Sequence, residues 1–224
     1  MAQTVDKSTL TFLRTLAKNN NRTWFAEHKD RYVAAQQNVK HCMQELEQLL
    51  NKHDVIESHR VYRIYRDVRF SKDKTPYKSN IGCGFTRATE ARRGGLFVNI
   101  QPGESFVGGG FWAPSAPDLK RIRSEIAVDA KPFRKVLRAK KFKEYFGELR
   151  GECLKTAPKG VDKNHPDIDL LRYKQYLLMR PFTDAEVLSD SFVAECNKTF
   201  KAMRPFFDLM SLTLTTDENG ESII

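Results

Sequence analysis

The sequence predicts an α+β fold, in which a central, mainly antiparallel and curved sheet of about five strands is covered by helices from both ends of the chain. Apolar residues recur at helical spacing towards both termini, whereas the middle of the chain alternates apolar with polar or glycine residues. Strands and helices do not alternate regularly, which argues against a doubly wound sheet. The 224 residues suit one sizeable core, so we expect a single domain over 1–214 and a polar, frayed tail over 215–224.

Helix signals flank the middle of the chain. Apolar stripes predict helices over 9–17, 24–50, from 115 onward, over 133–137, over 142–146 and from about 190 onward. Ser115 marks one helix start, and Thr183 with Glu186 forms a capping box for a short turn. Gly147 can end the 142–146 helix. Pro205 is expected to kink the last helix, because it removes a backbone hydrogen bond.

Strand signals lie between these helices. They predict strands over 61–65, 81–86, 96–100, 105–112 and 176–182. Pro102 followed by Gly103 predicts a type II turn between two of them, because glycine accepts the positive φ of that turn. Gly108–Gly110 indicates a bulge, or a place where another group approaches the backbone closely.

Composition narrows the classes of function. The formal net charge is +10 and the pI is about 9.5, which favours an anionic partner, although solubility alone also accounts for such an excess. The 4 cysteines are scattered without a close pair, and no zinc, calcium, P-loop or dinucleotide motif occurs, so no metal site or cofactor is indicated. We find no secretory signal and no membrane-spanning apolar run, and therefore expect a cytoplasmic protein.

Charged and aromatic side chains are most concentrated between Arg60 and Lys78, where arginines recur every third residue with tyrosines and a phenylalanine between them. Guanidinium groups bind phosphate in a bidentate manner, and aromatic rings add stacking faces. Our candidate ligand-binding residues here are Arg63, Arg66, Arg69, Ser71, Lys74, Tyr77 and Lys78. Asp67 is a candidate catalytic group. Alternatively, the arginines pair with carboxylates of neighbouring helices and the loop is only solvated.

The stretch from Arg63 to Lys78, RIYRDVRFSKDKTPYK, resembles the hallmark of a widespread family of conserved hypothetical proteins, domain of unknown function 2461. The resemblance extends from about residue 9 to 212 and includes Phe12-Leu13, Trp24-Phe25, Phe106–Gly110, Pro158–Gly160, His165-Pro166 and Arg204-Pro205. It implies an α+β domain. It implies no activity, cofactor or catalytic residue.

A second polar segment, Lys159–Lys174, contains His165 among several aspartates. Such a histidine is a candidate acid–base catalyst. Alternatively, this histidine caps the following helix or hydrogen-bonds a loop carbonyl. Lys174 joins the candidate ligand-binding residues.

Two functions of different class follow, and we favour the first, because the clustering of Arg, Asp, Ser and Lys in one short loop is more typical of a pocket than of a general electrostatic surface. The first is an anion-binding cleft built from the Arg63–Lys78 loop and the Lys159–Lys174 segment, which holds a phosphorylated small molecule and acts on it if Asp67 or His165 is catalytic. The second is a non-catalytic nucleic-acid-binding module that uses the same patch with Arg87, Arg92 and Arg93. A protein-interaction scaffold is a third alternative. A closed concavity would favour the small ligand, and a long open stripe would favour the polymer.

Overall fold

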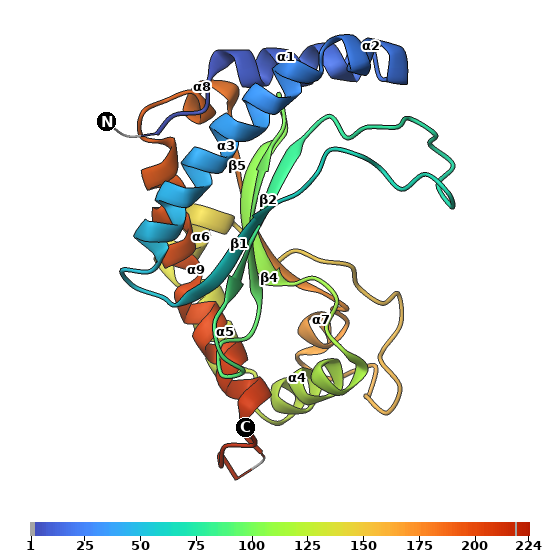
Figure 1. The fold of residues 1–224 in the computed structure, drawn as a ribbon. Coiled ribbons are helices and arrows are strands. Elements are labelled where there is room, and N and C mark those ends of the chain that lie inside the picture. Colours follow the sequence, from blue (N-terminus) through green and yellow to red (C-terminus); the bar gives the residue numbers. More distant parts are fainter. Residues whose placement is uncertain (1–2, 218) are drawn as a thin grey trace. The chain divides into compact units, whose positions relative to one another are not determined.

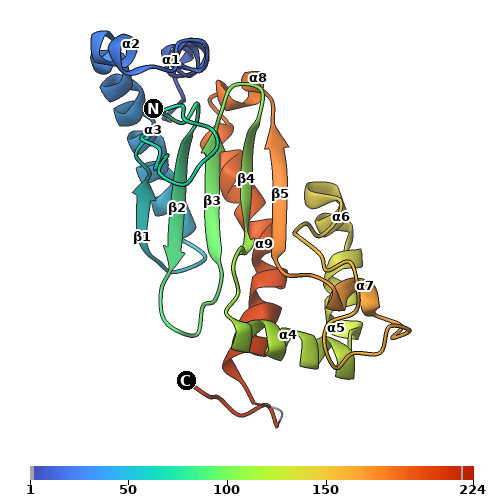
Figure 2. The ribbon, with the colours of Figure 1, turned by 90° about the vertical axis from the view of Figure 1, so that its right-hand side faces the viewer.

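The computed structural model describes residues 3–217 and 219–224, so Met1, Ala2 and one residue of the predicted tail lie outside the described part. It confirms the α+β class: five strands form one open antiparallel sheet in the order β1-β2-β3-β4-β5 (Figure 2). The strands are β1 (Ile56–Val61), β2 (Ile81–Arg87), β3 (Gly95–Ile100), β4 (Ser105–Phe111) and β5 (Tyr176–Phe182). The helices are α1 (Lys7–Lys18), α2 (Arg22–Glu27), α3 (Lys29–Leu50), α4 (Ala116–Val128), α5 (Lys131–Arg138), α6 (Lys140–Phe146), α7 (Ile168–Leu171), α8 (Asp184–Val187) and α9 (Phe192–Thr215).

The chain divides into two compact units. Unit 1 comprises Met1–Phe85, Phe97–Val107 and Pro181–Lys198. Unit 2 comprises Thr86–Leu96, Gly108–Arg180 and Thr199–Ile224.

In unit 1, α1 and α3 pack against each other and α3 packs against β1 (Figure 1). The buried faces of α1 and α3 carry the apolar residues that predicted these helices, among them Leu13 and Met43. The stripe expected to form one helix over 24–50 is divided into two. His28 leaves the helical conformation at φ −122° and ψ 22°, which ends α2 and starts α3.

The prediction of a strand over 61–65 is wrong by about five residues, because β1 ends at Val61. The alternation that suggested a strand has a different cause. Ile64 is buried, and Tyr65 pairs with Tyr77 in an isolated antiparallel bridge beyond the end of the sheet. A short two-stranded ladder has the same period of two as a sheet strand.

The turn between β3 and β4 follows the prediction. The Glu104 amide donates to the Gln101 carbonyl at 3.0 Å, and Gly103 has φ +79°. Thr183 and Glu186 form the predicted capping box at the start of α8.

In unit 2, the Ser115 hydroxyl accepts from the Asp118 amide and caps α4, as predicted. Gly147, at φ +69°, ends α6. The predicted close approach at Gly108–Gly110 is also confirmed. A Cβ atom added at Gly110 would lie 2.1 Å from the Tyr176 carbonyl oxygen of β5.

The last residues fold back on α9. Ile223 donates its amide to the Thr215 carbonyl at 2.9 Å, and Thr216 bridges Ser222. These contacts hold the described part of the tail, which the sequence predicted to be frayed.

Candidate functional site

The candidate site is the segment over 62–80 between β1 and β2, which we call the basic finger (Figure 1). Its two arms continue the pairing of the sheet. The Tyr62 amide donates to the Gly82 carbonyl at 2.9 Å, the Lys78 amide to Ile64 at 2.7 Å and the Arg66 amide to Pro76 at 2.9 Å. The finger is therefore a short hydrogen-bonded ladder that carries a tip over 67–74.

Aromatic packing anchors the base of the finger in unit 1. Tyr77 is 6% exposed and stacks on Phe25, with ring centroids 3.9 Å apart. The Asn20 side chain donates to the Tyr77 carbonyl at 2.9 Å and accepts from the Tyr77 amide at 3.1 Å. Burial raises the pKa of Tyr77 above its ordinary value. Tyr77, predicted to bind ligand, thus lies buried at the base of the finger, where its contacts with Phe25 and Asn20 fix the position of the finger.

Asp73 organises one side of the tip. Its carboxylate accepts from the Thr75 amide at 2.9 Å and from the Thr75 hydroxyl at 2.8 Å, and it pairs with Arg66. The Thr75 amide, followed by Arg66 and the Thr75 hydroxyl, lowers the pKa of Asp73 to about 2. Arg66 also donates to the Thr75 hydroxyl at 2.6 Å. These contacts orient the Arg66 guanidinium and neutralise part of its charge.

Asp67 and Arg69 form a second pair at the tip. Arg69 donates through Nε at 3.0 Å and through Nη2 at 2.6 Å to the two Asp67 oxygens. The hydrogen bonds from Arg69 lower the pKa of Asp67, so this carboxylate is ionised and engaged. Lys74 donates to the Val68 carbonyl at 2.9 Å. The partners of these cations come from the finger itself and not from neighbouring helices.

The side chains of three exposed cations of the finger form neither an ion pair nor a hydrogen bond with the described residues: Arg63, Lys72 and Lys78. Phe70 is 96% exposed at the tip, and the Arg69 guanidinium lies 6.0 Å from its ring centroid. Ser71 is half-buried beside it. The finger therefore presents free positive charge and one bare aromatic ring to the solvent.

The Lys159–Lys174 segment lies in unit 2, where several of its polar groups bind other elements of that unit. His165 Nδ1 accepts from the Asp167 amide at 3.0 Å, and Nε2 lies 3.3 Å from the Ala127 carbonyl oxygen. Both ring nitrogens thus have a partner, and the carbonyl belongs to the last turn of α4 and not to a loop. Lys174 pairs with Glu152 at 2.7 Å.

Arg134 of α5 holds this segment, and nothing in the sequence pointed to it. It donates to Asp167 Oδ1 through Nε at 3.0 Å and to Asp169 Oδ2 through Nη1 at 2.8 Å. The guanidinium of Arg134 lowers the pKa of Asp169. The finger belongs to unit 1 and this segment to unit 2, so a common cleft between them stays a prediction.

The arginines proposed to extend the patch also lie in unit 2. Arg87 is 5% exposed, and its guanidinium lies 5.1 Å from the Phe207 ring centroid. Arg93 donates to Asp118 at 2.6 Å. Arg87 and Arg93 are therefore engaged in structural contacts.

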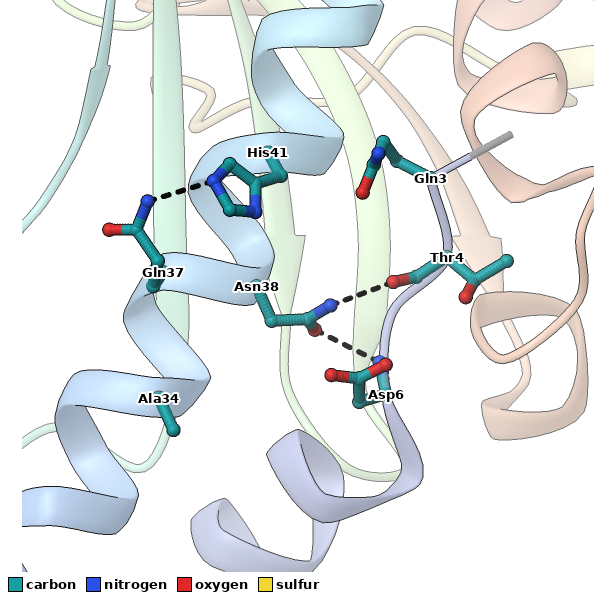
Figure 3. Close-up of a pocket in the computed structure, with 7 residues that line it drawn as sticks. All are labelled: Gln3, Thr4, Asp6, Ala34, Gln37, Asn38 and His41. Carbon is teal, nitrogen blue, oxygen red and sulfur yellow. Dashed lines mark hydrogen bonds between the residues drawn. The ribbon is translucent and has the colours of Figure 1, made fainter. Parts of the chain in front are cut away.

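A pocket of about 490 Å³ opens in unit 1 between α3 and the N-terminal segment, and no predicted site residue lines it (Figure 3). It is lined by Gln3, Thr4, Asp6, Ala34, Gln37, Asn38 and His41. The Asn38 side chain donates to the Thr4 carbonyl at 2.8 Å and accepts from the Asp6 amide at 2.9 Å. Its polar groups therefore attach the N-terminal segment to α3.

Within residues 3–217 and 219–224, no group of three or more His, Cys, Asp or Glu side chains is placed to hold a metal ion. Over the same residues, no helix combines the length and apolar character needed to cross a membrane.

The comparisons with known proteins identify a family. The model of the family described as "Conserved hypothetical protein (DUF2461)" matches residues 8–209, and these include the whole basic finger. No curated protein and no solved structure matches the chain. Since the family model covers most of the chain, as the finger motif led us to expect, this protein belongs to the DUF2461 family.

Proposed function

We propose that this chain is an anion-binding protein whose basic finger holds phosphate groups of its ligand. The observation that carries the proposal is a set of three exposed finger cations whose side chains have neither an ion-pair nor a hydrogen-bond partner among the described residues: Arg63, Lys72 and Lys78. An arginine fork and ammonium groups in solvent bind phosphate through charge-assisted hydrogen bonds.

The open form of the finger favours an extended ligand with several phosphates over a small enclosed one. Phe70, at the tip, is almost fully exposed, and Arg63 and Lys78 lie on the two arms. Positive groups spread along an exposed ladder match a chain of charges, whereas a small phosphorylated molecule is usually held in a concave site.

The proposal is for binding and not for catalysis. A general base needs a free lone pair within reach of the substrate. Asp67 is paired with Arg69, and the two ring nitrogens of His165 face the Asp167 amide and the Ala127 carbonyl of α4.

The test is to measure the dissociation constant for long-chain inorganic polyphosphate by isothermal titration calorimetry. Polyphosphate carries phosphate charge without bases or sugars. We expect binding that weakens as salt rises, because each phosphate contact releases a counterion. The double variant Arg63→Glu/Lys78→Glu should weaken binding by at least tenfold at low salt.

The control is Lys131→Glu/Lys140→Glu, which makes the same change in net charge at exposed positions outside the finger. It should retain most of the affinity. Equal losses in both double variants would mean that polyphosphate responds only to the overall charge of +10, and the assignment to the finger would then fail.

A further inference from the structure

Next to the finger, three aromatic rings form a row across the sheet of unit 1. Tyr62 follows β1, Phe97 lies on β3 and Phe106 on β4. The ring centroids of Tyr62 and Phe97 are 6.2 Å apart, and those of Phe97 and Phe106 are 5.9 Å apart. Tyr62 is 40% exposed, and the other two rings are half-buried. We call these three residues the aromatic row.

Glycines of β2 make room for the row. A Cβ atom at Gly84 would lie 2.5 Å from Tyr62 Oη, and one at Gly82 would lie 2.7 Å from Phe97 Cζ. The rings of Tyr62 and Phe97 therefore lie directly over the β2 backbone. The opposite face of β2 carries the buried apolar residues Ile81, Cys83 and Phe85. One face of β2 thus packs into the core, and the other lies under the partly exposed aromatic row.

Positive charge lies at the end of the row where the finger begins. The Arg60 guanidinium lies 5.9 Å from the centroid of the Tyr62 ring. Arg63 follows Tyr62 along the chain, and Lys78 is paired with Ile64 on the opposite arm. Arg60 and the unpaired cations of the finger therefore flank a run of aromatic faces.

We infer that the ligand is single-stranded nucleic acid, with bases stacked on the aromatic row and phosphates held by the basic finger. The inference rests on the proposed function, since the phosphate contacts are those of the finger. Aromatic rings on one face of an antiparallel sheet, beside a positive strip, bind single strands because every base presents a π-face.

Single strands fit better than a duplex, because the base faces of a duplex are already stacked on one another and are closed to the row. They fit better than an acidic protein segment, because carboxylates would pair with the cations and leave the three neighbouring rings, tilted by 34° and 39° from one to the next, without a planar partner. Successive rings about 6 Å apart offer places for successive bases.

The test is fluorescence anisotropy of the full chain with three labelled probes of equal length: an oligothymidylate, an abasic oligodeoxynucleotide and a duplex. We expect the oligothymidylate to bind at least tenfold more tightly than the abasic strand and more tightly than the duplex. This comparison uses the unaltered protein, so it stands whether or not a variant folds.

Variants then locate the bases. Phe97→Leu and Phe106→Leu keep apolar bulk and remove the rings, and each should weaken oligothymidylate binding roughly tenfold with little change for the abasic strand. Tyr62→Phe keeps the ring and should retain the affinity. Tyr145→Leu removes a ring that also lies beside cations, but in unit 2, and serves as the matched control.

The outcomes separate the two proposals. Equal binding of oligothymidylate and the abasic strand would overturn the base-stacking inference and leave phosphate binding by the finger intact. Tighter binding of the duplex, or losses as large in Tyr145→Leu as in Phe97→Leu, would also overturn it. Failure of polyphosphate and all three probes to bind would overturn the proposed function itself.

Discussion

At the scale of single residues, Asp73 shows how one exposed carboxylate orders the tip of the finger. It accepts two hydrogen bonds from Thr75 and pairs with Arg66. Each contact favours the ionised form, which is why the pKa of this carboxyl falls from 3.8 to about 2.

We therefore predict that Asp73 titrates with a pKa of about 2 and that Thr75→Val raises this pKa, because the hydroxyl donor is removed. A carboxyl whose pKa is lowered by folding adds to stability above its unfolded pKa. Here that contribution is complete above pH 3.8 and is lost as the pH falls towards about 2. The measurement is an NMR titration of the Asp73 carboxyl carbon. Titration near 3.8 in both proteins would show that the tip is not ordered in this way.

At the scale of elements, two glycines with positive φ do different work. Gly103 lies in the β3–β4 turn at φ +79° with no atom near its missing side chain. Gly110 of β4 has φ +134°, and the Tyr176 carbonyl of β5 occupies the place of a side chain. Gly103 is needed only for its backbone conformation. Gly110 is needed both for its conformation and because β4 and β5 approach each other closely there.

Alanine at these two positions should therefore have unequal effects. Gly103→Ala should lower the free energy of unfolding by about 1 kcal/mol, the cost of a left-handed conformation in a residue with a Cβ. Gly110→Ala should lower it by at least about 3 kcal/mol, because strain and a backbone clash act together. Urea unfolding of both variants checks this. Equal losses would show that β5 moves aside to accept the methyl group.

At the scale of the whole molecule, burial divides the cysteines. Cys42, Cys83 and Cys196 are buried, and Cys153 is exposed. Burial raises the pKa values of Cys42 and Cys83 to about 12. Since the thiolate is the reactive form, Cys42 and Cys83 are protected by both burial and protonation, and Cys196 is protected by burial.

Burial raises the pKa of Cys153 as well, so its exposure is what sets it apart. Cys153 should therefore react before the other three thiols with an aromatic disulfide reagent at pH 8, and all four should react after unfolding in guanidinium. The variant Cys153→Ser removes the fast phase and serves as the control. Fast reaction of a second thiol in Cys153→Ser would show that one of the three buried sites opens in the native molecule.

The fold class and most element boundaries could be predicted from the sequence, because the signals are local. The caps at Ser115 and Thr183 and the turn at Gly103 act between residues a few positions apart. The alternation in β2 reports which face is buried without reference to any partner strand. The basic finger could also be found, because its cations are adjacent in the chain.

Which side chains meet can be seen only in the folded molecule. The sequence predicted Tyr77 to bind ligand, whereas in the structure it stacks on Phe25 at the base of the finger. Arg134 carried no signal, since its aspartate partners lie more than thirty positions away. The aromatic row likewise joins residues from three separate segments over the glycines of β2. The periodicity of the sequence shows on which face of an element a side chain lies. Its neighbours depend on the register between strands and on which distant segments pack together, and both are properties of the folded molecule.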